Sequence, residues 1–192
     1  MNHATDEQIE SLAEKIKRSD KRAYDDFFRL MYPHLTGFAI TYMRDKSMAC
    51  DIVQDAFVIL WQKRFGIDTG KSLKSYMYQM VRNRCLNELR NRSKEVVSSE
   101  LAENNTISEM VIENQNNDRN SLGSLFREWI NALPERQKEA FELSRFEGMD
   151  HDEIAGLMNI SPKTVNNHIV AAMTQLRKYY KQYKQKNSIP DE

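Results

Sequence analysis

A short polar segment near the carboxyl end of the sequence carries side chains that can hydrogen-bond to DNA bases. An asparagine amide can pair with the edge of adenine through two hydrogen bonds, and lysine and threonine bind both base edges and phosphates. The candidate DNA-contact residues of this kind are Lys163, Thr164, Asn166, Asn167, His168 and, a few turns later, Arg177. Helical spacing puts them on one outward side, and an ordinary helical hairpin with a polar exposed face is the alternative.

The residues around this segment predict a helix-turn-helix that would hold it in place. Apolar positions recur at helical spacing on both sides of a short turn: Ile154, Leu157, Met158, Val165, Ile169, Ala172 and Leu176. Within the turn, Asn159 tolerates the left-handed backbone conformation that reverses the chain. Ser161 is a good helix cap and Pro162 a good first helical residue. We therefore expect two crossing helices, of which the second presents its polar side to a major groove.

A second basic segment, from Lys71 to Lys94, combines cations with aromatic residues. It contains seven Lys or Arg, opposed only by Glu88. Cations can hold phosphates while rings stack on bases at about 1–3 kcal/mol each, which suits single-stranded or opened nucleic acid. Tyr76, however, follows the apolar stripe of the predicted helix and is expected in the core. The aromatic spacing alone therefore leaves a solvated helix face as the alternative.

A third candidate surface lies on the helix DIVQDAFVILWQKR. Its outward side carries Asp51, Gln54, Asp55 and Val58. We interpret this side as a protein-binding face, with a plain solvated face as the alternative. Carboxylates one turn apart could hold a metal ion, but no histidine or further acid completes a shell, so we predict no metal site.

The apolar pattern is helical wherever it is sustained, which predicts an all-α protein. We expect a first helix behind a Thr5 cap, a second after Asp20 that ends before Pro33, and a further helix capped by Asp45. Residues 93–120 are rich in Ser, Asn and Glu and lack aromatics, as is typical of a flexible linker. The prediction is two small helical domains, residues 1–94 and 121–186, joined by an acidic linker, 95–120, and followed by a tail, 187–192.

The composition excludes several classes of function. The chain has 28 basic and 28 acidic residues, and its longest apolar run is far shorter than the roughly 20 residues that span a bilayer. With no secretory signal at the amino terminus, we predict a cytoplasmic location without membrane insertion. Cys50 and Cys85 lie in amphipathic patterns and are expected to be buried reduced thiols. No phosphate loop, acid–base pair or nucleophile motif is present, which predicts a non-enzyme without a cofactor.

Three segments in a fixed order carry a family resemblance. They read DIVQDAFVILWQKR, then SLKSYMYQMVRNRCLNELRNR after a Gly-containing loop, and, after the acidic linker, LPERQKEAFELSRFEGMDHDEIAGLMNISPKTVNNHIVAAMTQLRK. In this order and spacing the chain resembles an extracytoplasmic-function sigma factor of bacterial RNA polymerase. The resemblance implies a factor that binds core RNA polymerase, directs it to specific promoters and helps to open the DNA.

The resemblance also implies roles for the candidate surfaces. The residues that would contact the clamp helices of the large polymerase subunit are Asp51, Gln54, Asp55 and Val58. The loop from Phe65 to Lys71 would capture a flipped base of the minus-ten element, and the helix after it would grip the opened strand. The residues implied at the minus-ten element are Lys71, Lys74, Tyr78, Arg82, Asn83 and Arg84. The helix-turn-helix domain would read the minus-thirty-five element and dock on the flap of the other large subunit.

Family members are commonly held inactive by an anti-sigma protein, often membrane-bound, so such a partner is implied too. The sequence departs from the family at Tyr76, where Trp is usual, and at TVNNHI, where many members are more basic. One rival interpretation is a stand-alone helix-turn-helix regulator, which would bind duplex operator as a dimer. Another is a helical enzyme with a metal held by Asp25, Asp26, Asp51 and Asp55, which would bind stoichiometric Mg²⁺ or Mn²⁺.

Overall fold

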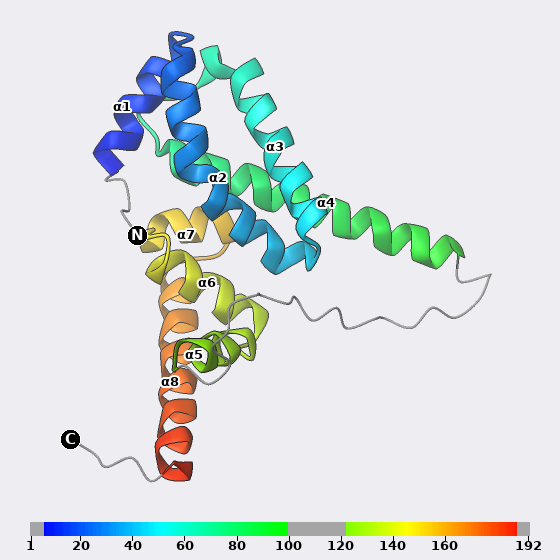
Figure 1. Ribbon diagram of the computed structural model, residues 1–192, viewed down its shortest axis with the longest axis vertical. Helices are drawn as coiled ribbons and strands as arrows, with labels where there is room; N and C mark the ends of the chain where they lie inside the picture. Colours follow the sequence, from blue (N-terminus) through cyan, green and yellow to red (C-terminus); the bar gives the residue numbers. More distant parts are fainter. Residues whose placement is uncertain (1–5, 100–121, 188–192) are drawn as a thin grey trace. The chain divides into compact units, whose positions relative to one another are not determined.

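The computed structural model describes residues 6–99 and 122–187, and every regular element in these ranges is helical (Figure 1). The first range holds α1 (Asp6–Lys17), α2 (Lys21–Met43), α3 (Lys46–Gln62), the short 3-10 helix η1 (Arg64–Gly66) and α4 (Leu73–Ser99). The second holds α5 (Leu122–Asn131), α6 (Glu135–Arg145), α7 (His151–Met158) and α8 (Pro162–Lys186). The predicted all-α fold is confirmed. In the ranges described, no helix has both the length and the apolar composition needed to cross a membrane.

The chain divides into two compact units, Met1–Ile112 and Glu113–Glu192. The division falls inside the predicted linker, residues 95–120, of which all but the first five lie outside the described ranges. Those first five residues are helical, because α4 continues to Ser99. Helix α4 therefore extends past residue 94, where the sequence predicted the end of the first domain.

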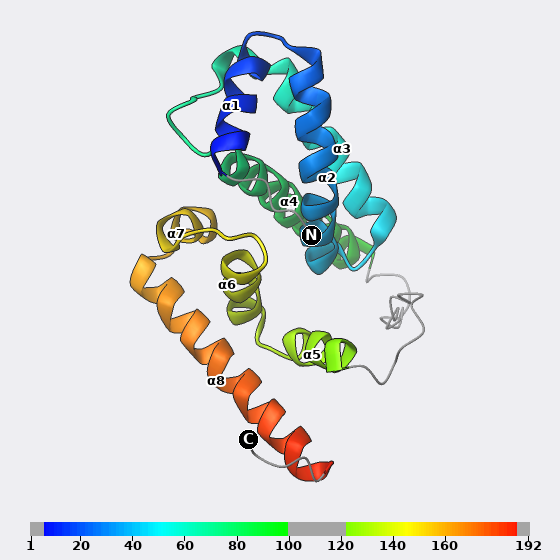
Figure 2. The ribbon, with the colours of Figure 1, turned by 60° about the vertical axis from the view of Figure 1, so that its left-hand side comes forward.

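Helix α2 is the centre of the first unit and packs against α1, α3 and α4 (Figures 1 and 2). Its buried side chains follow one stripe, from Ala23 through Phe27 and on to Met43. Where α2 meets α3, the rings of Phe27 and Phe28 lie 5.9 and 4.7 Å from that of Phe57. Buried aromatic side chains of this kind supply a large part of the apolar burial of a small core.

The sequence predicted that the second helix ends before Pro33, and this prediction is wrong. Pro33 lies inside the helix, which continues for ten residues to Met43. An interior proline removes one backbone hydrogen bond and costs about 3 kcal/mol or more. The apolar stripe nevertheless continues beyond it, since Leu35 and Phe38 are buried. Packing of this second half against the other helices offsets the local cost of the proline.

Two of the predicted helix caps in the first unit are confirmed. The carboxylate of Asp20 accepts hydrogen bonds from the backbone N–H groups of Arg22 and Ala23 at 2.9 and 3.2 Å. The carboxylate of Asp45 accepts one from the N–H of Met48 at 3.1 Å. The third predicted cap, at Thr5, lies outside the described residues. These caps fix where α2 and α3 begin, and with them the directions in which the exposed faces point.

Helix α8 is the long element of the second unit, and α5, α6 and α7 each pack against it. The predicted apolar stripe is confirmed, because the buried residues of α8 are Val165, Ile169, Ala172 and Leu176. Toward its carboxyl end the stripe joins Ile130, Leu133 and Phe141 in one cluster. The side of α8 opposite this stripe remains at the surface.

The two cysteines differ in burial, which corrects the expectation that both are buried. Cys85 on α4 is buried, whereas Cys50 on α3 is half-buried. Burial raises the pKa of the Cys85 thiol to about 11. Because the thiolate is the reactive species, we expect a thiol reagent to modify Cys50 in the native protein and Cys85 only on unfolding. Cys50→Ser should abolish the fast phase of labelling, and fast labelling of both thiols would contradict the structure.

Candidate nucleic-acid interfaces

The turn between α7 and α8 has the predicted helix-turn-helix geometry. Asn159 adopts a left-handed backbone conformation, with φ 55° and ψ 51°. The Ser161 hydroxyl accepts a hydrogen bond from the N–H of Thr164 at 3.1 Å, and α8 begins with the predicted proline. The N–H of Ile160 donates to the carbonyl of Ala155 at 3.1 Å, which closes the turn. The local sequence therefore determines this corner of the molecule.

The start of α7 is fixed by a capping box that the sequence analysis did not identify. The N–H of Glu153 donates to the Asp150 carboxylate at 2.8 Å, and the N–H of Asp150 donates to the Glu153 carboxylate at 3.1 Å. Just before it, Gly148 adopts a φ of 63° that favours glycine. The spacing of an acid three residues before Glu was the available signal. By fixing where α7 begins, the box also fixes where the turn falls.

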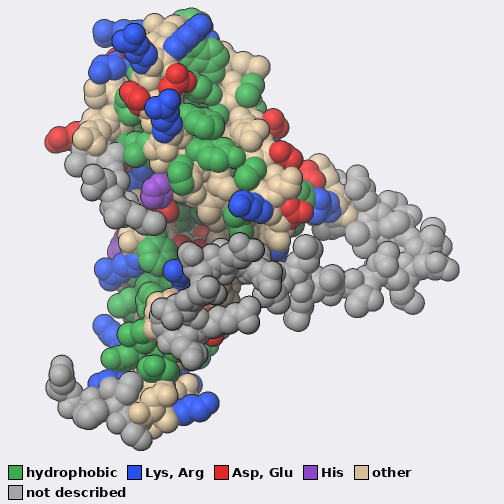
Figure 3. Space-filling model, viewed as in Figure 1, with side chains coloured by type: hydrophobic (Ala, Val, Ile, Leu, Met, Phe, Trp, Pro, Cys, Tyr) green, Lys and Arg blue, Asp and Glu red, His purple; other side chains and the backbone are tan. Residues whose placement is uncertain are grey.

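Helix α8 presents the predicted DNA-contact residues on its outer side. Lys163, Asn166, Asn167 and Arg177 are exposed, and Thr164 and His168 are half-buried. The Thr164 hydroxyl lies 2.8 Å from that of Ser161, so this side chain also belongs to the helix cap. Basic side chains are visible along the face of α8 that the space-filling view displays (Figure 3). A partner that approaches this side of α8 meets amides and cations.

Val170 adds an apolar group to this side of α8 that the sequence analysis did not include. Its side chain is 54% exposed, one turn after Asn166 and Asn167. In a major groove, an apolar side chain can contact the methyl group of thymine. The spacing from the two asparagines was the available signal, but a valine in an amphipathic helix is normally assigned to the core.

Burial of Glu142 on α6 of the second unit disfavours the charged form of its carboxylate. Burial raises the pKa of Glu142 from 4.5 to about 6, an effect that Lys138 opposes and that Glu147 and Glu139 increase. Between these two pH values the folded protein holds a proton that the unfolded chain has released. The contribution of Glu142 to the free energy of unfolding therefore falls as pH rises from 4.5 to 6, and this loss persists above pH 6.

Replacing this carboxylate should stabilise the second unit at neutral pH. We expect Glu142→Gln to raise the free energy of unfolding by about 1–2 kcal/mol above pH 6, a figure that already includes the opposing ion pair with Lys138 at 3.9 Å. Below pH 4.5 the variant and the parent should unfold alike. Thermal unfolding across pH measures this, with Glu128→Gln at an exposed position on α5 as the control. A gain that did not depend on pH would exclude ionisation as its cause.

The structure corrects the assignment of side chains on α4. Tyr78, predicted to contact DNA, is fully buried, and its ring meets that of Phe38 at 5.0 Å, whereas Tyr76, predicted in the core, is 43% exposed. Lys74 and Arg82, also predicted at the DNA, are buried and make interactions within the protein. The reason is that α4 packs against α1, α2 and α3, which together cover more than the single stripe that an amphipathic pattern assumes.

Three of the predicted minus-ten residues remain accessible. Lys71 and Asn83 are exposed, and the side chain of Arg84 is 31% exposed. Lys71 lies 3.4 Å from the carboxylate of Asp68 in the same loop. Arg84 lies 3.2 Å from the carboxylate of Asp55 on α3. Both cations are therefore partly neutralised within the described structure.

The loop before α4 carries an aromatic platform that was not foreseen. The Arg64 guanidinium lies 4.4 Å from the ring centre of Trp61 and 4.3 Å from that of Phe65. Hydrogen bonds to the Ser19 hydroxyl at 2.8 Å and to the Trp61 carbonyl at 2.7 Å hold it there. Phe65 itself is 67% exposed. Such a ring is the kind of surface on which an unpaired base can stack.

The predicted protein-binding side of α3 is exposed along its length. Asp51, Gln54, Asp55 and Val58 all lie at the surface, and acidic side chains gather along the outer edge of α3 (Figure 3). The Gln54 amide lies 3.5 Å from the Tyr32 hydroxyl. In the part of the chain that the structure describes, no three His, Cys, Asp or Glu side chains come together as a metal site.

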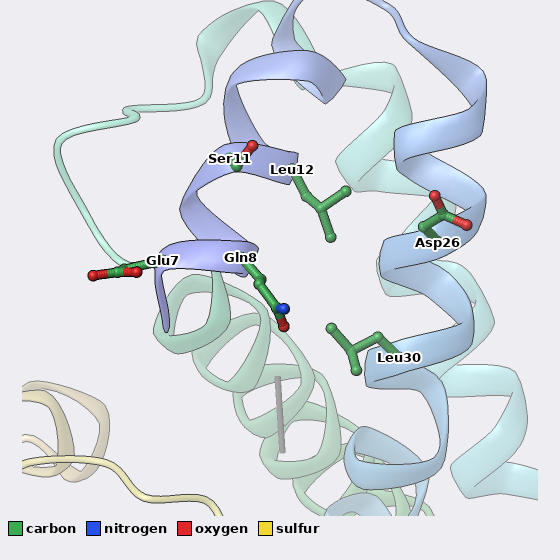
Figure 4. Close-up of a pocket in the computed structure, with 6 residues that line it drawn as sticks. All are labelled: Glu7, Gln8, Ser11, Leu12, Asp26 and Leu30. Atoms are coloured by element: carbon green, nitrogen blue, oxygen red, sulfur yellow. The ribbon is translucent and has the colours of Figure 1, made fainter. Parts of the chain in front are cut away.

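Two further grooves are apolar and lie one in each unit. One, of about 480 Å³, lies between α1 and α2, where Leu12 and Leu30 point into it and Glu7 and Asp26 stand at its rim (Figure 4). The other, of about 470 Å³, is lined by Leu122, Gly123, Phe126, Trp129, Leu176 and Tyr180 of α5 and α8. The mainly apolar surface of each groove could accommodate an apolar side chain of a partner protein.

Comparison with protein families gives a match on each unit. Residues 27–95 match the model for sigma-70 region 2, and residues 124–176 match the model for sigma-70, region 4. The RNA polymerase sigma-H factor of Pseudomonas aeruginosa is 26% identical over 183 residues, covering 91% of this chain and 94% of that protein. The ECF RNA polymerase sigma factor RpoE of Cereibacter sphaeroides is 24% identical over 162 residues, covering 83% and 87%.

Solved structures show the same fold. The sigma factor RpoE of Bartonella quintana, solved in complex with the anti-sigma factor NepR, is similar with a TM-score of 0.62 and 23% identity, covering 82% of this chain and 96% of that one. CnrH, solved in complex with the cytosolic domain of CnrY, gives a TM-score of 0.62 and 18% identity, covering 91% and 98%.

Proposed function

Because the chain belongs to the extracytoplasmic-function sigma factors of the sigma-70 family, we propose that its two units contact the two elements of a promoter separately. It is a transcription initiation factor and not an enzyme: it binds core RNA polymerase, directs it to promoters and helps to open the DNA, while the polymerase performs the chemistry. The observation that carries the proposed division is that the region 2 and region 4 matches fall on different compact units.

In this proposal the second unit reads the minus-thirty-five element. Its helix-turn-helix would place the amino-terminal part of α8 in the major groove, as such motifs do. Asn166 and Asn167 would contact base edges, Lys163 a base or a phosphate, and Val170 a thymine methyl group. Arg177, further along α8, would contribute to phosphate contacts, which add affinity without sequence preference.

The first unit would hold the opened strand at the minus-ten element. The accessible groups there are Lys71 and Asn83, and Arg84 would join them when it is no longer paired with Asp55. The exposed ring of Phe65 offers a stacking surface. A flipped base costs a few kcal/mol of unstacking, which stacking and phosphate contacts in the protein can offset. Buried Tyr78 would act as support for this surface and not as a contact.

Polymerase would bind both units. The exposed side of α3, with Asp51, Gln54, Asp55 and Val58, is our candidate for the clamp helices of the large subunit. The apolar groove between α5 and α8 suits an apolar side chain from the flap of the other large subunit. An anti-sigma protein is a further proposed partner, since the similar sigma factor RpoE of Bartonella quintana was solved with one, and it could be membrane-bound. We place the factor in the cytoplasm, where it would meet polymerase.

The test of this function is transcription from a fragmented genomic library by core RNA polymerase, with and without the purified protein. New start sites that share two upstream motifs at a fixed spacing are expected, and they would supply the promoter sequence at once. If no new starts arise and the protein alone binds duplex DNA as a dimer, the stand-alone regulator would replace the sigma factor as the function.

Asn166 should determine which upstream sequence is preferred. We expect Asn166→Ala to lose about 1–3 kcal/mol of discrimination at one base pair of the minus-thirty-five element, because the amide would no longer pair with its base edge. The measurement is selection of upstream sequences from a randomised promoter library by the reconstituted holoenzyme. Gln182→Ala, near the far end of α8, is the control. An unchanged preference would remove Asn166 from the base-reading residues.

A further inference from the structure

Asp55 and Arg84 form an ion pair between two surfaces that we assign to different partners. The Arg84 guanidinium lies 3.2 Å from the Asp55 carboxylate, which joins the middle of α3 to α4. The Asp55 side chain is 68% exposed and that of Arg84 is 31% exposed. The carboxylate is thus open to an approaching cation, while the guanidinium is the less exposed partner and donates a hydrogen bond to that carboxylate.

The surroundings of this pair separate it from the other charges nearby. A groove between α3 and α4 is lined by Asp55 and Arg84 and also by Asp51, one turn before Asp55 on α3. Glu88, one turn after Arg84 on α4, is paired with Arg92 at 3.3 Å. Within the described residues, Arg84 forms its salt bridge with Asp55. Asp51 therefore offers a matched carboxylate on the same helix face and in the same groove.

We propose that Asp55 is a positioning residue that neutralises Arg84 in the free factor, and that polymerase releases Arg84 to the opened DNA strand by engaging Asp55. The inference rests on the proposed function of the two faces. A carboxylate that attracts a cation of the polymerase attracts Arg84 less, so the positive charge of Arg84 becomes available to a phosphate. Polymerase binding and strand binding would then favour one another.

The coupling between polymerase binding and strand binding is limited by the solvent exposure of the Asp55–Arg84 pair. Exposed pairs of this type contribute little, so the coupling should be at most about fivefold in affinity. Coupling between two binding sites is reciprocal. A bound single strand must therefore raise the affinity for polymerase by the same factor by which polymerase raises the affinity for the strand.

The first experiment uses the free protein and a fluorescent single-stranded DNA oligonucleotide of mixed sequence at low ionic strength. We expect Asp55→Asn to strengthen binding by about two- to fivefold, because Arg84 gains its full charge. Arg84→Gln should weaken binding of the oligonucleotide. In the Arg84→Gln background, Asp55→Asn should increase the affinity only by as much as the matched variant Asp51→Asn does. Asp51→Asn removes the same charge from the same face and measures the general electrostatic effect.

Two outcomes of this cycle would overturn the proposal. One is an equal effect of Asp55→Asn and Asp51→Asn on affinity, because loss of a negative charge from this face would then explain the whole effect. The other is a gain from Asp55→Asn that persists in full without Arg84. Circular dichroism of each variant would show whether the helices are retained, and Arg84→Lys, which keeps the charge, should restore part of the response to Asp55→Asn.

The second experiment measures binding to core polymerase with and without the oligonucleotide. The parent protein should bind polymerase up to about fivefold more tightly with the strand present, and Arg84→Gln should lose this gain. A gain that persists in Arg84→Gln would overturn the coupling. If no variant binds polymerase at all, the proposed function fails, whereas the free-protein cycle still decides whether Asp55 neutralises Arg84.

Discussion

Phe57→Ala should lower the free energy of unfolding of the first unit by about 3–5 kcal/mol. Phe57 is 1% exposed, and its ring meets those of Tyr24, Phe27 and Phe28. Truncation would leave a cavity where α2 and α3 cross, and the Tyr24 hydroxyl, which donates to the Phe57 carbonyl at 3.0 Å, would lose the ring beside it. A small domain has a total stability of only about 5–15 kcal/mol, so partial unfolding is expected on mild heating.

The two tryptophans allow this loss to be measured unit by unit. Trp61 belongs to the first unit and Trp129 to the second. Urea unfolding of the full chain with Trp129→Phe reports on the first unit, and Trp61→Phe reports on the second. Val58→Ala, next in sequence but 52% exposed, should change the unfolding free energy by less than about 0.5 kcal/mol. A similar loss in both variants would show that Phe57 is not the centre of this core.

Asp51→Arg should weaken binding to core RNA polymerase by about tenfold or more, without unfolding the chain. In our proposal this carboxylate faces the clamp helices, and its reversal places like charges opposite one another, which costs more than removing the charge. Asp51 is preferable to Asp55 for this test, because Asp55 is also bonded to Arg84. Because Asp51 is exposed on α3, its replacement should leave the unfolding free energy within about 0.5 kcal/mol of the parent.

Competition with a labelled parent protein for core polymerase would measure this effect. The matched control is Glu10→Arg, which makes the same change of charge at an exposed position on α1 and should bind polymerase nearly as the parent does. If Asp51→Arg competes as well as the parent, the side of α3 that we assign to polymerase is wrong. If both reversals weaken binding equally, net charge and not a defined contact is responsible.

The helix-turn-helix was predictable because its determinants are local. Asn159, Ser161 and the proline after it act on the backbone within a few residues of themselves, so their effects do not depend on the rest of the fold. The polar side of α8 followed from the apolar stripe on the other side. The helices that pack against α8 all do so along this one stripe, so helical spacing determines which of its residues are exposed.

The environment of α4 was not predictable in the same way. A sequence pattern does not reveal that three helices surround one element, and here that arrangement buries Lys74, Tyr78 and Arg82 while it exposes Tyr76. Pro33 is a similar case. Its local preference to end a helix is overcome by burial of residues that follow it, and the size of that burial depends on distant parts of the chain.

The sequence by itself determined the helical class, the caps of α2, α3 and α8, the turn before α8 and the outward positions of Lys163, Asn166 and Asp51, since spacing and short-range hydrogen bonding govern each of these. Only the tertiary structure decided which cations of α4 reach the surface, tied the Arg64 side chain to the Ser19 hydroxyl, and joined Asp55 to Arg84. Each of these features brings together side chains from segments that are far apart in the sequence. Such meetings depend on how whole helices pack, which no local pattern encodes.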